Sequence, residues 1–503
     1  MSVFTSSKML LLILGMSSGL AFAPLFLFPT LLFLSVLIYQ TYKASSAQDA
    51  FIKGFIFGFG HFLTGMYWIS LGVSVYIDEF WWAIPFALFG LPLVLAFFIA
   101  ATCAVSWTAR SSRHFRWIFC VSWVFFEWVR SWIFTGLPWN LLGQSLAFSD
   151  ALIQPASIFG TYGLSLVTIY ISTFLFHAFT RQKQYFRSSI IVSVSVICLM
   201  FAFGLLRLEN HPTNYSTISV RLVQPSIQQV SKWDEQEFWN NLDKHINLSV
   251  IAGTEPDLII WSEAALVVPY KYPPIKNEIL KMLTGTKSIL ITGGISDNGK
   301  SDSDYELYTT FQAIAPSGEL LLEYHKSHLV PFGEYMPLKN ILPIKKLTHG
   351  FTDYTAGPLS LLDLKQLNLK IKPLICYEAI FPEIVRTSNR LADVIINITN
   401  DAWYGNSSGP YQHLHITRLR ALENGLPVLR TGNNGISAII DPLGRIVKQL
   451  ALNEVGVING YMPIKISKPT IYSLWGEFIV IILGMLMLLI QPLITFMRKL
   501  YQN

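Results

Sequence analysis

Long apolar runs divide the chain into two kinds of sequence. Residues 1–206 are strongly apolar, and a further apolar run covers 471–497. Between them, residues 207–470 alternate short apolar and polar stretches over a length sufficient to bury a hydrophobic core. The pattern predicts a membrane domain over 1–206, a globular domain over 207–470, and a last transmembrane helix with its tail over 471–503.

The apolar runs approach or reach the length of membrane-spanning helices, which need about 20 residues. They lie at 8–23, 25–41, 52–74, 82–107, 117–136, 160–180, 188–206 and 471–497. Ala21-Phe22-Ala23 resembles a signal-peptide cleavage site, but Pro24 and a second apolar run follow it directly. This favours a helical hairpin over a cleaved signal peptide. We therefore expect seven transmembrane helices before the globular domain and an eighth after it.

Basic residues fall at the chain ends and in alternate loops between these runs. They are Lys8, Lys43, Lys53, Arg110, Arg113, Arg116, Arg181, Lys183, Arg187, Arg498 and Lys499. The intervening loops contain Asp78, Glu79 and Asp150 and no lysine or arginine. Because positively charged loops stay in the cytoplasm, we expect both termini there. The globular domain is then expected on the opposite side, which in a bacterium is the periplasmic face of the inner membrane.

Two charged residues lie within the fifth apolar run. Glu127 and Arg130 are three residues apart, a spacing that places them on one face of a helix. They can form an ion pair that satisfies itself inside the membrane, or they can contact a lipid head group. We favour the ion pair.

The globular part alternates strand and helix patterns. Strands are expected at 217–224, 257–262, 288–295, 308–315, 319–325, 370–376, 393–399, 427–432, 436–441 and 445–450. Helices are expected at 234–252, 274–285, 380–389 and 410–424. This mixture of hairpins and crossovers predicts an α/β sandwich with the sheets inside and the helices outside.

The composition of the chain limits the kinds of partner and site that we expect. The chain is 52% hydrophobic and 14% charged, against about 25% charged residues in soluble domains. The net charge of +6 comes from basic residues clustered in short loops, so it indicates no nucleic-acid partner. No disulfide framework or zinc-type spacing is present. His413 and His415 cannot share one helix face, so we interpret both as structural and expect neither a metal nor a cofactor.

Cys376 is the candidate nucleophile. It is the only cysteine in 207–470, because Cys103, Cys120 and Cys198 all lie in apolar runs. It ends a predicted strand, whereas Glu263 and Lys326 each follow one. Convergence of these three strand ends would give the thiol a general base in Glu263, and a positive charge in Lys326 to stabilise the thiolate and an oxyanion.

Several motifs give a resemblance to known families. Those around the three residues, Trp261-Ser262-Glu263, Tyr324-His325-Lys326 and Cys376-Tyr377-Glu378, resemble the Glu-Lys-Cys signature of the carbon–nitrogen hydrolase (nitrilase) superfamily. Further segments are similar to the apolipoprotein N-acyltransferase family, at 134–139, 160–164, 328–338, 400–405, 420–425 and 431–435. One departure is Ser262, where the family commonly has proline. This changes local backbone stiffness but removes no catalytic group.

The resemblance implies a nitrilase-like αββα sandwich inserted between the helices of an eight-helix membrane domain. It implies transfer of an acyl chain from a glycerophospholipid to the N-terminal amine of a diacylglyceryl-cysteine lipoprotein, the last step of lipoprotein maturation. Cys376 would carry the chain as a thioester in a ping-pong mechanism. Four further residues would support the reaction. Glu334 would orient Lys326 or the incoming amine, and Glu378 would shape the nucleophile pocket. Tyr377 and Trp233 would contact lipid or thioester, although simple packing explains Trp233 equally well.

Two other functions fit the same residues. A membrane-tethered amidase or nitrilase-type hydrolase would pass the thioester to water, and would release fatty acid without acylating an amine. A non-catalytic membrane protein would use the fold to bind lipoproteins, and would keep its activity after Cys376→Ala.

Overall fold

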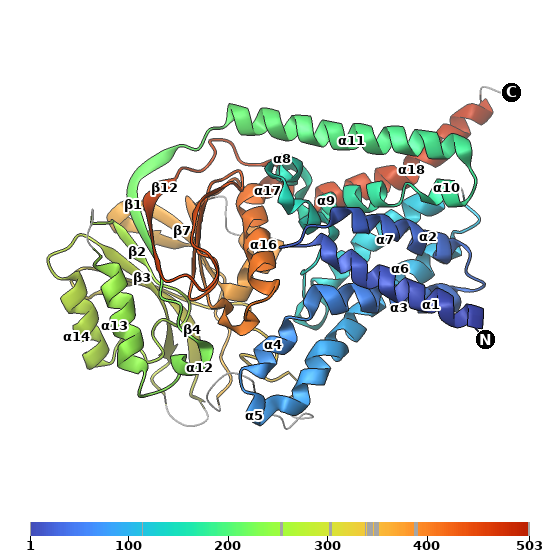
Figure 1. Cartoon of the computed structure of the whole chain (residues 1–503). Coiled ribbons are helices and arrows are strands. Elements are labelled where there is room, and N and C mark those ends of the chain that lie inside the picture. The colour runs from blue at the N-terminus through green and yellow to red at the C-terminus, as the bar shows by residue number, and fades with distance from the viewer. Residues whose placement is uncertain are drawn as a thin grey trace. The chain divides into compact units, whose positions relative to one another are not determined.

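The computed structural model describes residues 2–112, 114–251, 255–300, 304–337, 339, 346, 352–386 and 391–500, with side chains described outside 2–6, 184 and 490–500. The chain forms two compact units (Figure 1). The first comprises Met1–Ser70, Pro85–His211 and Thr470–Asn503, and the second comprises Leu71–Ile84 and Pro212–Pro469. Of the sequence predictions, Arg113, residue 252 and residues 387–389 lie outside the described residues.

The first unit is built from helices. They are α1 (Ser2–Ser18), η1 (Gly19–Ala21), η2 (Phe28–Phe33), α2 (Leu34–Tyr42), α3 (Ala47–Met66), η4 (Phe86–Gly90), α6 (Leu91–Thr108), α7 (Phe115–Arg130), η5 (Ile133–Thr135), η6 (Leu142–Phe148), α8 (Asp150–Ile153), α9 (Ala156–Ser172), α10 (Phe176–Phe179), α11 (Lys183–Asn210), α17 (Ile471–Trp475) and α18 (Phe478–Leu500). Among the described residues, three stretches have the length and apolarity to cross a membrane, at 86–108, 156–179 and 185–210. Shorter apolar helices cover 7–21, 28–42 and 478–489. The count of eight spans stays a prediction.

Glycines let the helices of this unit approach closely. A Cβ on Gly54 or Gly58 of α3 would meet the backbone or side chains of α6 at 3.1 Å or less. A Cβ on Gly60 would lie 2.4 Å from the main-chain oxygen of Leu12 in α1. Small residues at helix contacts are typical of packing in membranes, where van der Waals contact replaces the hydrophobic effect between helices.

The fifth predicted span ends earlier than expected. The run 117–136 is helical in α7 only to Arg130; the chain then turns and has positive φ angles at Phe134 (56°) and Thr135 (74°). Glu127 accepts hydrogen bonds from Trp123 Nε1 at 3.0 Å and from the Leu142 amide at 2.9 Å.

Arg130 likewise binds the main chain beyond this helix. It donates to the main-chain oxygens of Leu137 at 2.9 Å and Trp139 at 2.7 Å. Together with Glu127 it anchors the segment 137–142, a role that the sequence spacing did not indicate.

The second unit contains two six-stranded sheets. The first has the order β12-β1-β2-β3-β4-β5 and the second β11-β10-β9-β8-β7-β6. The strands are β1 (Tyr215–Gln224), β2 (Leu258–Ile260), β3 (Ile289–Asp297), β4 (Leu307–Ile314), β5 (Leu320–His325), β6 (Leu362–Leu364), β7 (Leu369–Ile375), β8 (Val394–Thr399), β9 (Val428–Gly432), β10 (Ala438–Ile440), β11 (Ile446–Gln449) and β12 (Gly456–Pro463). Each sheet has a parallel centre, β1-β2-β3 or β7-β8-β9, flanked by antiparallel strands.

All ten predicted strands are present, and β6 and β12 are additional. β6 has only three residues, and β12 begins at Gly456, contains Gly460 and ends at Pro463, so neither has a strong strand pattern.

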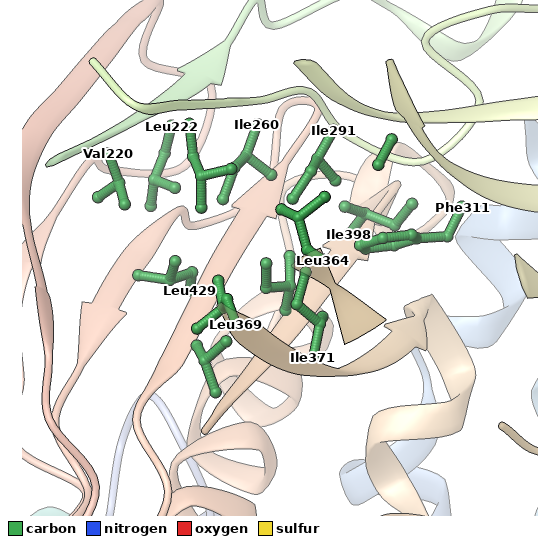
Figure 2. Packing of buried hydrophobic residues seen from close by; sticks show 14 of the residues in the cluster. Val220, Leu222, Ile260, Ile291, Phe311, Leu364, Leu369, Ile371, Ile398 and Leu429 are labelled. Atoms are coloured by element: carbon green, nitrogen blue, oxygen red, sulfur yellow. The ribbon is translucent and has the colours of Figure 1, made fainter. Parts of the chain in front are cut away.

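Apolar side chains from the two sheets pack against each other and form the main core. Figure 2 shows this layer, in which Val220, Leu222 and Ile260 of the first sheet face residues such as Ile371 and Leu429 of the second. The strands contribute every second residue to this layer, as expected when successive side chains point to opposite faces.

The outer helices complete the layers. α13 (Phe238–Ser249) and α14 (Pro273–Leu283) pack on the outer face of the first sheet through a second apolar cluster (Figure 1). α16 (Gly409–Asn424) contacts β9 of the second sheet. The α/β sandwich with sheets inside and helices outside is therefore confirmed. The helix expected at 380–389 begins later, at Pro382 (α15, Pro382–Arg386), because a 3₁₀ turn, η9 (Cys376–Ile380), precedes it.

A segment outside the predicted globular domain also belongs to the second unit. Residues 71–84 contain most of α4 (Ile69–Ser74), α5 (Ile77–Phe80) and η3 (Trp81–Ala83). The Tyr76 ring lies 6.1 Å from the Trp403 ring, centroid to centroid. A Cβ on Gly72 would lie 3.0 Å from the main-chain oxygen of Trp403. The loop between two predicted spans thus packs on η11 (Asp401–Tyr404), beside the site described next.

Candidate active site

Strand ends bring the predicted polar residues together. Lys326 directly follows β5, Cys376 directly follows β7, and Glu263 lies three residues beyond β2. Lys326 Nζ lies 3.1 Å from Glu263 Oε1 and 2.7 Å from Glu334 Oε1. Lys326 is 1% exposed, Cys376 6%, and the two glutamates 7% each. The four residues form one buried cluster at the strand ends.

Lys326 carries a fixed positive charge in this cluster. Burial by itself would lower its pKa, but the charges of Glu263, Glu334 and Cys376 outweigh burial and hold the pKa well above its ordinary value. A buried ammonium persists only when it is paired. The lysine is therefore a permanent cation beside the thiol.

Glu263 is fixed from both its side chain and its backbone. Oε2 accepts a hydrogen bond from the Asn400 amide at 3.0 Å, and the main-chain oxygen accepts one from Lys232 Nζ at 2.8 Å. A Cβ on Gly293 of β3 would lie 2.6 Å from the Glu263 Cα, so the neighbouring strand needs glycine for this approach. Oε1 stays in contact with Lys326, in reach of the site.

Glu334 sits in a tight turn between Pro331 and Tyr335. Its Oε2 accepts from the Val330 amide at 2.8 Å, and its main-chain oxygen accepts from the Tyr354 amide at 2.9 Å. Burial raises the pKa of Glu334, and Lys326 counteracts this effect. Of the two functions predicted for Glu334, orientation of Lys326 is the one for which the structure supplies a contact.

Cys376 is held as a thiol in an unusual backbone conformation. Its φ is +48°, in the left-handed region that residues other than glycine seldom adopt. Burial raises the pKa of the thiol and the charge of Glu263 adds to this, whereas the charge of Lys326 and the Thr399 side chain lower it; the net shift is upward. A thiol that is protonated at rest would need a base to act as a nucleophile.

Glu378 joins the ends of two strands from different sheets. Its Oε1 accepts from Tyr324 Oη at 2.6 Å and from the amide and hydroxyl of Ser327, each at 2.7 Å. Its Oε2 accepts from the Ile375 amide at 2.7 Å. This carboxylate fixes the spacing between the turn that carries the lysine and the strand that carries the thiol.

The two aromatic residues predicted to contact substrate differ in their surroundings. Tyr377 is buried, and its ring lies 5.8 Å from the His328 ring and 5.0 Å from the Phe381 ring. Trp233 is half-buried and follows Lys232 directly. Contact of either residue with lipid or thioester stays a prediction.

Two buried basic residues were missed by the sequence analysis. Lys232 is 4% exposed, and burial lowers its pKa to about 8. His413, interpreted as structural, places Nε2 3.2 Å from the main-chain oxygen of Cys376. The only sequence feature that could have pointed to Lys232 was its position before Trp233. His413 lies too far from Cys376 in the sequence for a local pattern to predict their contact.

The cluster combines a thiol, a carboxylate at hydrogen-bond distance from a cation, and low exposure to water. A thiol nucleophile, a carboxylate base and a cation for the developing oxyanion are the requirements of acyl transfer through a thioester. Among the residues that the structure describes, no group of three or more His, Cys, Asp or Glu side chains could hold a metal ion.

Family models match both parts of the chain. The model described as carbon-nitrogen hydrolase matches residues 219–466, and the model described as apolipoprotein N-acyltransferase N-terminal domain matches residues 14–174. The first match contains Glu263, Lys326 and Cys376, and the second covers much of the helical unit.

Similar proteins extend over nearly the whole chain. It is 57% identical over 490 residues to an apolipoprotein N-acyltransferase of Rickettsia prowazekii, covering 97% of this chain and 98% of that one. It is 35% identical over 428 residues to a protein of the same name from Brucella melitensis, covering 82% of this chain and 79% of that one. Among solved structures, an amidase of the nitrilase superfamily from Nesterenkonia aligns with 18% identity and a TM-score of 0.37, covering 50% of this chain and 92% of that one.

Proposed function

The chain belongs to the apolipoprotein N-acyltransferase family, and we propose that it transfers an acyl chain from a membrane glycerophospholipid to the N-terminal amine of a diacylglyceryl-cysteine lipoprotein. The acyl chain is carried as a thioester on Cys376. The observation that supports these roles is the placement of Lys326 Nζ 3.1 Å from Glu263 Oε1 in a buried cluster with the thiol.

In the first half-reaction Glu263 takes the thiol proton and Cys376 Sγ attacks the ester carbonyl of the phospholipid. The Lys326 ammonium stabilises the tetrahedral oxyanion. The carbon–oxygen bond then breaks, Glu263 returns the proton to the glycerol oxygen, and lysophospholipid leaves. The acyl carbon remains bound to Sγ.

In the second half-reaction the neutral lipoprotein amine attacks the thioester carbonyl. Glu263 accepts a proton from the attacking nitrogen, and Lys326 again stabilises the oxyanion. The carbon–sulfur bond breaks, the proton passes to Sγ, and the N-acylated lipoprotein leaves. The same base and cation therefore serve both steps without another reactant.

Supporting residues hold this machinery in place. Glu334 orients Lys326, and Glu378 fixes the distance between the lysine turn and the cysteine strand. Tyr377 and Trp233 line the route of the acyl chain or the thioester.

The acyl chains of both substrates explain why the enzyme is a membrane protein. Moving an acyl chain into water costs about 0.8 kcal/mol per CH₂ group. An enzyme anchored by apolar helices meets the chains where they are already solvated by lipid. The alternation of basic and acidic loops supports an inner-membrane protein with cytoplasmic termini and residues 207–470 on the periplasmic side.

Mass spectrometry of the purified protein tests the thioester. After exposure to phospholipid vesicles, an adduct of one acyl chain on the peptide that contains Cys376 is expected, and hydroxylamine should remove it. Cys376→Ala should show no adduct. An adduct on another residue, or none on the folded wild-type protein, would overturn the assignment.

A further inference from the structure

A buried chain of polar side chains leads to the backbone of the nucleophile. Arg430 Nη2 donates to Asp401 Oδ2 at 2.7 Å, and Asp401 Oδ1 lies 2.9 Å from His413 Nδ1. The other ring nitrogen, His413 Nε2, lies 3.2 Å from the main-chain oxygen of Cys376. The side chains of Arg430, Asp401 and His413 are each 0% exposed. The chain connects β9, η11 and α16 to the residue that carries the thiol.

Packing leaves these groups little freedom to move. Thr399 Oγ1 donates to Asp401 Oδ1 at 3.0 Å, and Arg430 Nη1 donates to Thr417 Oγ1 at 3.2 Å. A Cβ on Gly435 would lie 2.4 Å from Asp401 Oδ2, so any larger residue there would displace the carboxylate. A hydrogen-bonded network of this kind orients its members in a single arrangement.

The Cys376 backbone needs such support. Its φ of +48° is costly for a non-glycine residue and persists only where the surroundings hold it. In a planar trans peptide, the carbonyl and the following N–H point in opposite directions. Because His413 binds the Cys376 carbonyl on one side, the Tyr377 N–H is directed to the other side.

The bond to Cys376 determines where the His413 ring carries its proton. A main-chain oxygen only accepts hydrogen bonds, so Nε2 must be protonated. Nδ1 faces two groups, Asp401 Oδ1 at 2.9 Å and Arg430 Nη2 at 3.1 Å. It donates to Asp401 when it carries a proton and accepts from Arg430 when it does not. Burial and the charge of Arg430 lower the pKa of His413 and Asp401 counteracts them, but the bond from Nε2 to Cys376 is present in both forms.

We propose that His413 is a positioning residue for the thiol. By holding the Cys376–Tyr377 peptide, it keeps Sγ and the adjoining N–H in the orientation that attack on an acyl carbonyl requires. This inference rests on the proposed acyl transfer, and it assigns to His413 an effect on the rate of acylation rather than on phospholipid binding.

Two substitutions test the two ring nitrogens of His413 separately. The amide nitrogen of an asparagine at 413 occupies the place of Nδ1, whereas that of a glutamine reaches the place of Nε2. His413→Asn should lower the rate of acyl-enzyme formation roughly 10- to 100-fold, as expected for one lost hydrogen bond to the reacting residue. Its KM for phospholipid should not change. His413→Gln should retain the rate to within about fivefold, since it keeps the donor to Cys376.

His415→Asn is the matched control, because His415 lies on the same helix and binds Arg418 instead. It should acylate as wild type does. A wild-type protein that forms no acyl-enzyme contradicts the proposed function, whereas His413→Asn acylating at the wild-type rate contradicts only the positioning role. Equal losses in folded asparagine and glutamine variants would also overturn it. If the asparagine variant does not fold, His413→Gln decides alone: a loss near 100-fold in the folded protein refutes the proposal.

Discussion

Lys326 lies closer to Glu334 than to Glu263, with Nζ–Oε1 distances of 2.7 Å and 3.1 Å. The proposed base therefore shares the lysine charge with a second carboxylate, because both Glu263 and Glu334 hold the pKa of Lys326 up. With Glu334 balancing part of that charge, Glu263 can also accept a proton from the thiol.

Replacing Glu334 should slow acyl-enzyme formation, because the charge of Lys326 would no longer be shared between two glutamates. In Glu334→Gln the ammonium has one carboxylate partner left, and it competes with the thiol proton for Glu263. We expect the rate of acyl-enzyme formation to fall roughly 10- to 100-fold, equivalent to about 1.4–2.7 kcal/mol. Single-turnover acylation by phospholipid measures it. Glu323→Gln on β5 is the control, and a Glu334→Gln rate within threefold of wild type would contradict the role.

Glu263 should affect two reactions of the thiol in opposite directions. Its charge helps to raise the pKa of Cys376, so Glu263→Gln should increase the thiolate fraction. Alkylation of Cys376 by iodoacetamide at pH 8 should then be faster than in wild type, whereas acylation should fall about 100-fold or more without the base. Peptide mass spectrometry distinguishes Cys376 from the exposed Cys198. If both reactions slow down in the folded variant, Glu263 does not act as described.

Lys232 is expected to lower the stability of the folded protein. Burial lowers its pKa from 10.5 to about 8, which corresponds to roughly 3 kcal/mol against folding at neutral pH. The hydrogen bond to Glu263 offsets about 1–3 kcal/mol of this. Lys232→Met should therefore match or exceed wild type in thermal stability at pH 7, while acylation falls about tenfold as Glu263 loses its backbone anchor.

The pH dependence of this stability effect has a defined sign. The cost of burying the ammonium is fully present below pH 8 and disappears as the pH rises toward 10.5, where the unfolded chain also loses the proton. The advantage of Lys232→Met in melting temperature should thus shrink between pH 7 and pH 9.5. An advantage that grows with pH would show that Lys232 is not buried as a strained cation.

Glu378 should be needed for folding of the site. An amide at this position has one acceptor oxygen and places an NH₂ group against donors such as the Ile375 amide. Glu378→Gln should lower the free energy of unfolding by about 2–4 kcal/mol, with loss of activity following from it. Thermal unfolding in detergent measures this, with the exposed Glu319→Gln as control. A melting temperature equal to wild type would contradict the structural role.

Local sequence patterns predicted the strands and helices whose own residues show a clear apolar pattern. The strands around Ile260, Ile291 and Ile398 are short, β-branched and buried, and all ten predicted strands are found. β6 and β12 were missed because one is too short for a period to be visible and the other is an edge strand interrupted by glycine. The end of α7 and the start of α15 were missed because a turn after Arg130 and a 3₁₀ helix before Pro382 interrupt apolar sequences that still look helical.

The site was predictable only as far as residue type and strand ends allowed. Glu263, Lys326 and Cys376 each stand at or just beyond a strand, and motif resemblance added Glu334 and Glu378. Which carboxylate lies nearer the lysine depends on a turn geometry that no periodicity encodes. The contact of His413 with Cys376, and the packing of residues 71–84 on η11, depend on segments far apart in the chain.

A chase experiment tests the central claim, that a Cys376 thioester passes its acyl chain to an amine. Wild-type protein is loaded from labelled phospholipid, freed of excess lipid, and mixed with a diacylglyceryl-cysteine peptide while the label on Cys376 and on the peptide is followed. The label should leave Cys376 at the rate at which the N-acylated peptide appears. Release of the label as free fatty acid, with the peptide unmodified, would contradict the account and make the enzyme a hydrolase.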